Sequence, residues 1–280
     1  MGFGWSLNPY MGCAHQCTFC YVRNFERRAE RPSGEAYGSS IRVKTNVVEV
    51  LRRELMRRSW RREVVAIGTA TDPYQPAEGH YRLTRGCLEA LAQARTPVHL
   101  ITRGPLVVRD LDVLRGFAGR AELEVNFSIP TLDLEVWRRT EPGTAPPRQR
   151  LRVLSRLAAA GVRVGVGMAP LLPGLSDRPG QLAEVVRAAR DAGAAHLWAN
   201  LLHLQPGTRE HFLEHLGRDW PEERARYEAM YGPRGYLPAS VVEPVLERVG
   251  RLRERYGLAE RGASSGATAG EEPRQLALFG

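Results

Sequence analysis

Three cysteines stand close together near the start of the chain. The segment CAHQCTFCYVR places Cys13, Cys17 and Cys20 in the spacing C-x3-C-x2-C. Three thiolates in one tight loop can hold three irons of a cubane 4Fe-4S cluster, which leaves the fourth iron without a protein ligand. An open coordination position is where a catalytic metal meets its substrate. The motif therefore predicts an iron-sulfur site that does chemistry.

Two other kinds of site use clustered cysteines, and both need a fourth ligand. A zinc site would take it from His15 or Cys87, and a simple electron-transfer cluster would need a fourth cysteine. His15 lies inside the loop, and Cys87 falls on the apolar face of a predicted helix beside Leu88 and Leu91. A core thiol is the expected role there. A non-enzymatic protein that binds zinc or a cluster therefore remains the weaker alternative.

Composition limits the classes of protein that fit. The chain has 280 residues, of which 43% are hydrophobic and 25% charged, as in ordinary globular domains. No apolar stretch approaches the roughly 20 residues that span a bilayer, and the N-terminus lacks the layout of a signal peptide. These features predict a cytoplasmic protein without a membrane segment, whose thiols stay reduced. The net charge of +9 favours an anionic partner such as nucleic acid, although arginines scattered along the whole chain also fit a GC-rich coding bias.

Short β-branched runs alternate with amphipathic stretches from about Glu63 onward, which is typical of parallel strands joined by helices. Gly161 and Gly193 are predicted to end helices, and Pro147 suits the first turn of another. About six strand-helix units fit either an incomplete barrel or an open doubly wound sheet, both with the active site at the carboxyl ends of the strands. Strands are expected near residues 6–10 and over 64–69, 98–102, 123–129, 162–169 and 196–203.

The end of the chain differs from the rest. We predict one domain over residues 1–257, whose last helix covers 240–256, and a flexible tail over 258–280, because residues 258–274 are small, polar and without periodicity. The tail ends in QLALF, which resembles the short peptide by which bacterial DNA polymerases and repair proteins dock on the sliding clamp; Ala277 is the one departure. The alternatives are a chance match, or apolar residues that fold back onto the barrel. The residues that would contact the clamp are Gln275, Leu276, Leu278 and Phe279.

The cysteine spacing, with Phe19 directly before the third cysteine, is similar to the signature of radical S-adenosylmethionine (SAM) enzymes. That resemblance implies an α/β fold, an incomplete (β/α)6 barrel of the TIM type with C-terminal helices. It also implies a SAM cofactor whose methionine amine and carboxylate chelate the unique iron. One electron, supplied by a reductant such as flavodoxin or ferredoxin, then cleaves SAM and releases a 5'-deoxyadenosyl radical that abstracts hydrogen from the substrate.

Further segments narrow the resemblance. SLNPYMGCAHQCTFCYVR, GTATDPYQPAE, TRGPLVVRDLDVL, VNFSIPTLD and PLLPGLSD are similar to the spore photoproduct lyase-like branch, also described as DNA repair photolyase-like. The branch implies a nucleic-acid lesion or modified base, flipped out of its stack, as substrate; a radical reaction on a small molecule or peptide is the alternative. Thr69 stands where spore photoproduct lyase carries a hydrogen-donating cysteine, and a hydroxyl O–H is too strong to replace it. Spore photoproduct itself is therefore not expected as the substrate.

The resemblance also assigns residues to the cofactor. It places Phe19 against the adenine and Tyr21 near the cofactor or substrate, among the catalytic residues. Thr71, Arg103 and Ser128 match positions at strand ends that hold the methionine and ribose. A guanidinium suits the methionine carboxylate, and hydroxyls suit amine, carboxylate or ribose oxygens. Threonine or serine at a strand end also commonly caps the next turn.

Two more polar residues are expected at the same edge. Asp72 is grouped with the catalytic residues, because an acid in the stiff TDPYQPAE loop can orient the cofactor amine; bonding to backbone amides is the other interpretation. His203, at the end of the last predicted strand, faces either the adenine or the core.

Overall fold

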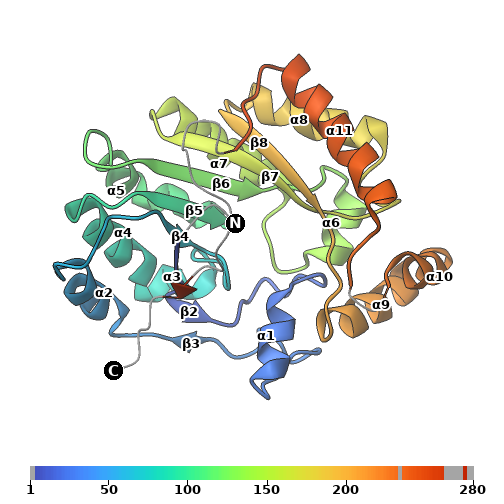
Figure 1. Ribbon diagram of the computed structural model, residues 1–280, viewed down its shortest axis with the longest axis horizontal. Coiled ribbons are helices and arrows are strands. Elements are labelled where there is room, and N and C mark those ends of the chain that lie inside the picture. The colour runs from blue at the N-terminus through green and yellow to red at the C-terminus, as the bar shows by residue number, and fades with distance from the viewer. Residues whose placement is uncertain (1–3, 233–234, 262–273, 276–280) are drawn as a thin grey trace.

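Six parallel strands form the centre of the fold. The computed structural model describes residues 4–232, 235–261 and 274–275. In this part of the chain the main sheet has the order β8-β7-β6-β5-β4-β1-β9 and is not closed on itself (Figure 1). The incomplete barrel predicted from the sequence is confirmed. Its strands are β1 (Trp5–Leu7), β4 (Val65–Ile67), β5 (Val98–Thr102), β6 (Leu123–Ser128), β7 (Arg163–Leu171), β8 (His196–Leu201) and the short β9 (Arg274–Gln275).

Helices cover the outside of the curved sheet, and α1 and α9 lie across from it (Figure 1). Gly161 and Gly193 have φ of +82° and +89° just after two of these helices, as predicted, and Pro147 begins α7. The helices are α1 (Val22–Arg28), α2 (Val47–Leu55), α3 (Pro76–Tyr81), α4 (Leu83–Gln93), η1 (Pro105–Asp110), α5 (Leu111–Arg115), α6 (Leu134–Thr140), α7 (Pro147–Ala159), α8 (Pro179–Asp191), α9 (Thr208–Asp219), α10 (Pro221–Met230) and α11 (Ala239–Arg255).

The first predicted strand, residues 6–10, is divided in two. β1 belongs to the main sheet, whereas β2 (Tyr10–Met11) pairs with β3 (Arg42–Val43) in a separate antiparallel ribbon. The break falls at Asn8, whose side-chain carbonyl accepts a hydrogen bond from the Ala70 amide at 2.9 Å. The chain thus leaves the sheet before the cysteine loop, which the ribbon positions beyond the strand ends.

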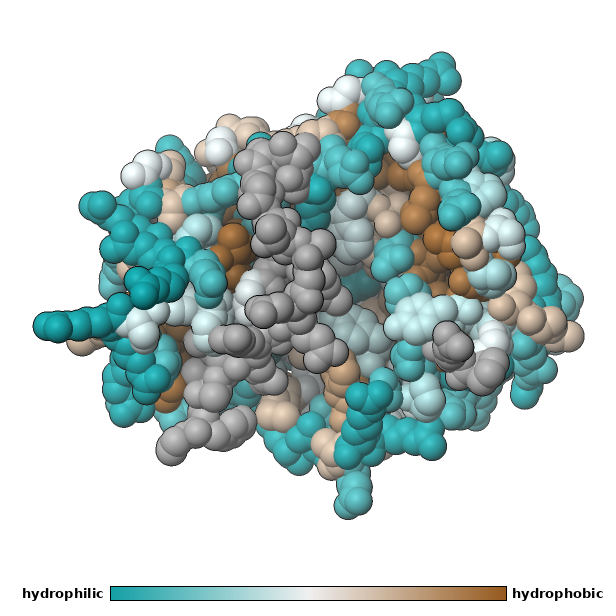
Figure 2. Space-filling model, viewed as in Figure 1, coloured by the Kyte–Doolittle hydropathy of each residue, from teal (hydrophilic) through white to brown (hydrophobic). Residues whose placement is uncertain are grey.

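The core lies between the sheet and its outer helices. Strands β4, β5 and β6 are almost fully buried, and so are apolar helix residues such as Leu51, Leu88 and Leu154. Figure 2 shows hydrophilic residues over most of the periphery of one face, with apolar residues mainly in its hollows. Among the described residues, no helix is both long and apolar enough to cross a membrane.

Two glycines of β7 make room inside the barrel. A Cβ on Gly165 would lie 2.1 Å from Nε2 of His196, and a Cβ on Gly167 would lie 2.7 Å from the Trp198 ring. Real Cβ atoms do not approach other atoms so closely, so the rings of β8 depend on glycine in the neighbouring strand. The glycines therefore shape the interior that the cavity described below enters.

The folded domain extends past the predicted boundary at residue 257. Leu258 is buried, and the carbonyl of Ala259 accepts a hydrogen bond from the Leu197 amide of β8 at 3.0 Å. The backbone of Arg274 and Gln275 lies parallel to β1. The rest of the predicted tail, with Leu276, Leu278 and Phe279 of the clamp-like peptide, lies outside the described residues.

Candidate active site

A cavity of about 910 Å³ opens where the parallel strands end. The three motif cysteines line it from one side. The opposite wall is made by residues that end or follow β4 to β8, namely 68–72, 101–103, 128, 169–170 and 201–203. The structure therefore brings together the cysteine loop and every cofactor residue expected from the sequence: Phe19, Tyr21, Thr71, Asp72, Arg103 and Ser128.

The cysteine loop is held from three directions. The Thr18 amide donates to the carbonyl of Thr140 at 2.9 Å, and the Ala14 amide donates to Oε1 of Gln75 at 3.0 Å. Gly143 packs against the loop so closely that a Cβ would lie 2.5 Å from the Ala14 carbonyl. Contacts from α6, from the turn after it and from the loop after β4 thus fix the loop.

Arg23 fills the space beneath this loop, and sequence reasoning did not find it. Its side chain is fully buried, and its guanidinium donates to the carbonyl of Cys17 at 3.4 Å and to that of Gly34 at 2.6 Å. It also lies 4.6 Å from the centre of the Tyr37 ring, whose hydroxyl is 3.5 Å from Sγ of Cys20. A buried cation under three thiols favours negative charge in the loop.

The thiols themselves suit a cluster better than a zinc ion. Burial raises the pKa of Cys17, an effect that Arg103 opposes, so a bound metal would be needed to keep the thiolate. Among the described residues, the cysteines do not form a group whose ligand atoms all lie within 4.8 Å of one another. Thiolates on one tetrahedral zinc ion are about 3.8 Å apart, given Zn–S bonds of about 2.3 Å. The wider spread and the adjoining cavity fit a cubane, and Cys87 lies apart in the core.

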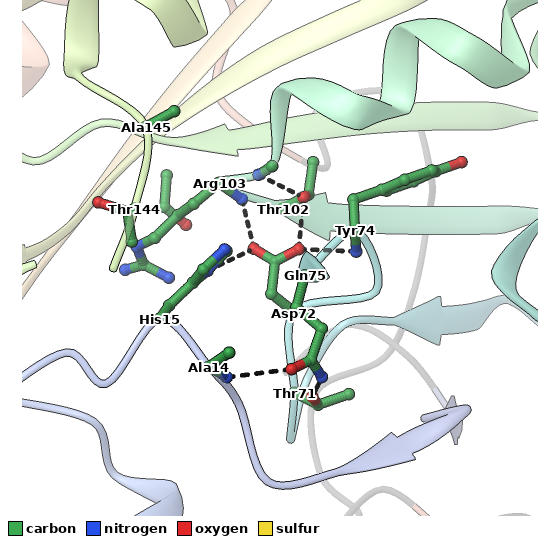
Figure 3. Close-up of polar contacts among 12 residues, drawn as sticks. Ala14, His15, Thr71, Asp72, Tyr74, Gln75, Thr102, Arg103, Thr144 and Ala145 are labelled. Carbon is green, nitrogen blue, oxygen red and sulfur yellow. Dashed lines mark hydrogen bonds and ion pairs between the residues drawn. The ribbon is translucent and has the colours of Figure 1, made fainter. Parts of the chain in front are cut away.

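Asp72 joins the cysteine loop to β5 (Figure 3). Its carboxylate accepts hydrogen bonds from the amides of Tyr74 at 2.8 Å and Arg103 at 2.6 Å, and from the hydroxyl of Thr102 at 2.7 Å. Nδ1 of His15 lies 3.4 Å away. Burial would raise the pKa of Asp72, but His15 and these hydrogen bonds lower it to about 2.

The same contact holds His15 in its charged form. Burial opposes the charge, yet the Asp72 carboxylate raises the pKa of His15 to about 10. His15 therefore faces an acid rather than serving as a fourth metal ligand. With this many partners Asp72 is tied to protein groups, so the geometry favours a positioning role, and its catalytic role stays a prediction.

Thr71 is also bonded to the loop. Its hydroxyl donates to the carbonyl of Gly12 at 2.6 Å and accepts from Nε2 of Gln75 at 2.8 Å. Ser128 ends β6 on the cavity wall. The hydroxyl of Thr71 therefore donates its hydrogen bond to the segment that leads into the cysteine loop and not to the turn that follows β4.

Arg103 reaches the cavity from the end of β5. Its guanidinium donates to the carbonyl of Ala169 at 3.2 Å and lies 3.4 Å from Oε2 of the buried Glu141. Its central carbon is 5.7 Å from the centre of the Phe19 ring. Arg150, at 2.5 Å, is the second cation on Glu141, so one positive charge remains in excess beside the cavity.

The mouth of the cavity carries exposed aromatic rings. Tyr21 and Phe25 meet edge to face with ring centres 5.9 Å apart, and they are 43% and 47% exposed. His203 and Tyr236 form a second pair at 4.8 Å. His203 thus lies exposed at the rim and not in the core, and Arg28 lines the same opening.

The cavity also reaches polar groups inside the barrel. His99 and Trp198 line it, and Nε2 of His99 lies 3.6 Å from the buried carboxylate of Glu124. Nε1 of Trp198 is buried and has no hydrogen-bond partner among the described residues. A buried donor without a partner favours a polar ligand within reach. The alternating apolar pattern of these strands gave no signal for this polar interior.

Comparison with known proteins decides the family. The sequence model of the Radical SAM superfamily matches residues 7–186. The chain belongs to this superfamily. Radical SAM proteins use a 4Fe-4S cluster and SAM, and this chain is accordingly an enzyme with that pair of cofactors, whose reaction is unassigned.

Similarity to other proteins covers more than half of the length of this radical SAM enzyme in each of three comparisons. An uncharacterized protein of Mycobacterium tuberculosis is 39% identical over 279 residues, which cover 99% of this chain and 82% of the relative. A protein of Pseudomonas phage M6 named radical SAM Nalpha-GlyT isomerase is 26% identical over 168 residues, which cover 60% of this chain and 33% of the relative. A solved variant of spore photoproduct lyase with bound AdoMet and dinucleoside spore photoproduct has a TM-score of 0.67 at 16% identity, covering 90% of this chain and 73% of that chain. The last likeness concerns the fold.

Proposed function

We propose that Cys13, Cys17 and Cys20 hold the 4Fe-4S cluster and that the enzyme acts on a nucleic-acid lesion or modified base in the cytoplasm. When bound, the cluster and SAM would supply radical chemistry that abstracts a hydrogen atom from the substrate. A one-electron reductant is required by radical SAM enzymes in general, and flavodoxin or ferredoxin is the donor that we propose.

The protein's own residues would orient the cofactor. Arg103 carries the excess positive charge beside the cavity and would pair with the methionine carboxylate. Phe19, which is 5% exposed on the cavity wall, would lie against the adenine, and Ser128 would bond a ribose or carboxylate oxygen. Thr71 donates its proton to Gly12 and accepts from Gln75, so one of its two lone pairs is left to accept from the methionine amine.

The aromatic rim is the observation that favours a nucleic acid. Every base has a π-face that stacks on aromatic side chains, and a positively charged rim attracts the phosphate backbone. Tyr21, Phe25 and Tyr236 are among the most exposed large apolar side chains of the described residues, and all three line the cavity mouth with Arg28. The net charge of +9 points the same way.

One of the compared proteins has a description that concerns a nucleic-acid component. Spore photoproduct lyase was solved with a dinucleoside photoproduct. Thr69 of this chain cannot replace a hydrogen-donating cysteine, so we do not propose spore photoproduct as the substrate. A modified base or another lesion is still a nucleic-acid substrate, and its reaction need not include hydrogen donation by a cysteine.

Substitution at the rim tests the substrate class. We expect Phe25→Ala and Tyr236→Ala each to weaken binding of a fluorescein-labelled single-stranded DNA by about 5- to 150-fold, because stacking on one ring contributes about 1–3 kcal/mol. Fluorescence anisotropy at increasing salt measures this, and the affinity should fall as salt rises. Tyr81→Ala is the matched control, since Tyr81 is 45% exposed on α3 and does not line the cavity. No binding, or equal losses in all three variants, would favour a small molecule or peptide.

We further propose that the QLALF end docks on the DNA sliding clamp. Burial of Leu278 and Phe279 in a pocket would contribute roughly 3 to 6 kcal/mol before ordering costs. The backbone of Gln275 lies beside β1, so docking would release this two-residue pairing. A peptide of residues 270–280 should bind a purified bacterial clamp with micromolar affinity, measured by calorimetry. The double substitution Leu278→Ala and Phe279→Ala should abolish binding. An unchanged affinity of the doubly substituted peptide for the clamp would contradict docking.

A further inference from the structure

A second cluster of metal-ligating side chains lies outside the cavity. His211 and His215 stand one turn apart on α9, and Glu35 reaches them from the segment between α1 and β3. One ligand atom from each residue lies within 4.8 Å of the other two. Oε1 of Glu35 is 3.3 Å from Nε2 of His215 and 4.0 Å from Nδ1 of His211. We propose that these three side chains bind a divalent transition-metal ion such as zinc.

The hydrogen bond on His215 leaves the right nitrogen for a metal. Nδ1 of His215 lies 2.9 Å from the carbonyl of His211, which accepts only from an N–H. A neutral ring then has its lone pair on Nε2, the atom that faces Glu35. Metal-bound histidines are commonly fixed by such a bond from the other ring nitrogen. Nε2 of His215 and Oε1 of Glu35 are 3.3 Å apart, so one cation can bind both atoms.

His211 also presents a ring nitrogen to Glu35. Its side chain is 5% exposed, and its Nδ1 lies 4.0 Å from Oε1 of Glu35. Zinc bonds to nitrogen and oxygen are about 2.0–2.2 Å long, so one ion can bridge ligand atoms that are 3.3 to 4.0 Å apart.

The surroundings leave room for a further ligand. A hollow of about 270 Å³ adjoins the three side chains. Three of its arginines have partners of their own: Arg218 pairs with Asp219 at 3.0 Å, Arg23 donates to the carbonyl of Ser33 at 2.8 Å, and Arg139 pairs with Glu135 at 2.8 Å. A water molecule can therefore complete a tetrahedral ion. A bound anion such as phosphate is the competing occupant, because arginines also line the hollow.

The position of the cluster suggests what the ion does. Gln16 and Thr18 of the cysteine loop line the same hollow. Arg23 links the carbonyl of Gly34, next to Glu35, with that of Cys17, and Tyr37 follows with its hydroxyl against Cys20. An ion that ties Glu35 to α9 would hold this segment in place. The site is thus a positioning site for the cysteine loop, separate from the cofactor cavity.

Metal analysis of the whole chain tests the proposal. Protein with its reconstituted cluster should bind one Co²⁺ or Zn²⁺ in addition to its iron, seen by elemental analysis and by the visible spectrum of Co²⁺. Glu35→Gln and His215→Gln should each weaken Co²⁺ binding by at least about 10-fold, a typical loss for a ligand or its support. The Glu35 side chain is 75% exposed, so its variant tests the site without disturbing the core. His80→Ala, on α3, should change nothing.

Three results would overturn the site. They are no Co²⁺ binding below millimolar concentration, Co²⁺ binding that Glu35→Gln and His215→Gln leave unchanged, and inorganic phosphate that binds the hollow and excludes Co²⁺. Iron content is measured in the same samples, so loss of the cluster would be recognised separately from loss of this second ion.

Discussion

Cys13→Ala, Cys17→Ala and Cys20→Ala are each expected to reduce SAM cleavage below detection. Each change would remove one of the three thiolates proposed to hold the cluster, and Cys87 does not line the cavity. The measurement is 5'-deoxyadenosine released from SAM after anaerobic reconstitution and reduction. Wild-type protein should contain about four irons per chain, and the three variants should contain fewer.

Cys87→Ala is the matched control for these variants. Cys87 is fully buried on α4 among apolar residues, so its loss should leave the iron content and SAM cleavage unchanged. It should lower the free energy of unfolding by about 1–2 kcal/mol, because a small buried side chain is truncated. Iron lost from Cys87→Ala but retained by Cys13→Ala, or zinc as the only metal bound, would contradict the assignment.

Arg103→Ala is expected to weaken SAM binding about 10- to 100-fold. A hydrogen bond to a charged group contributes about 1.5–3 kcal/mol, and the methionine carboxylate would lose its cation in a water-poor cavity. The fold should survive, because Arg150 still neutralises Glu141 at 2.5 Å. Equilibrium dialysis of SAM with cluster-loaded protein gives the affinity, and iron analysis should show an unchanged cluster.

Arg103→Lys separates charge from shape at the same position. Lysine keeps the positive charge but lacks the planar fork, so we expect an affinity between those of wild type and Arg103→Ala. Unchanged SAM affinity in Arg103→Ala would show that the methionine carboxylate binds elsewhere. Loss of iron would instead show that Arg103 stabilises the cysteine loop. The central carbon of its guanidinium lies 5.7 Å from the centre of the Phe19 ring in that loop.

Local pattern determined the chemistry and most of the fold. The spacing of Cys13, Cys17 and Cys20 predicted the metal loop, since ligands for one cluster must come from a short turn. The strand predicted over residues 98–102 is β5 as observed, and the other main strands differ by a few residues at their ends. Such runs stand out in the sequence because strands of a parallel sheet are covered on both faces and are therefore rich in β-branched and other apolar residues.

Tertiary structure alone decided which polar groups meet around that loop. Asp72 contacts His15, 57 positions earlier, and Arg103, 31 positions later. The sequence assigned no role to Tyr37 or to Arg23, although Arg23 ends the CAHQCTFCYVR segment, because tyrosine and arginine acquire these roles only when buried against the loop. Hydrophobic periodicity shows which face of a helix or strand is apolar. It does not show which other element packs against that face.

The same limit explains the rim, the second ion site and the end of the domain. Tyr21 and Tyr236 come from opposite ends of the chain, as do Glu35 and His211, so only the closing of the fold brings them together. Residues after 257 read as linker because they are small and polar, yet Ala259 bonds the backbone of β8. Every residue type has a backbone carbonyl, and every type except proline has a backbone N–H. Amino-acid composition therefore could not reveal this backbone pairing.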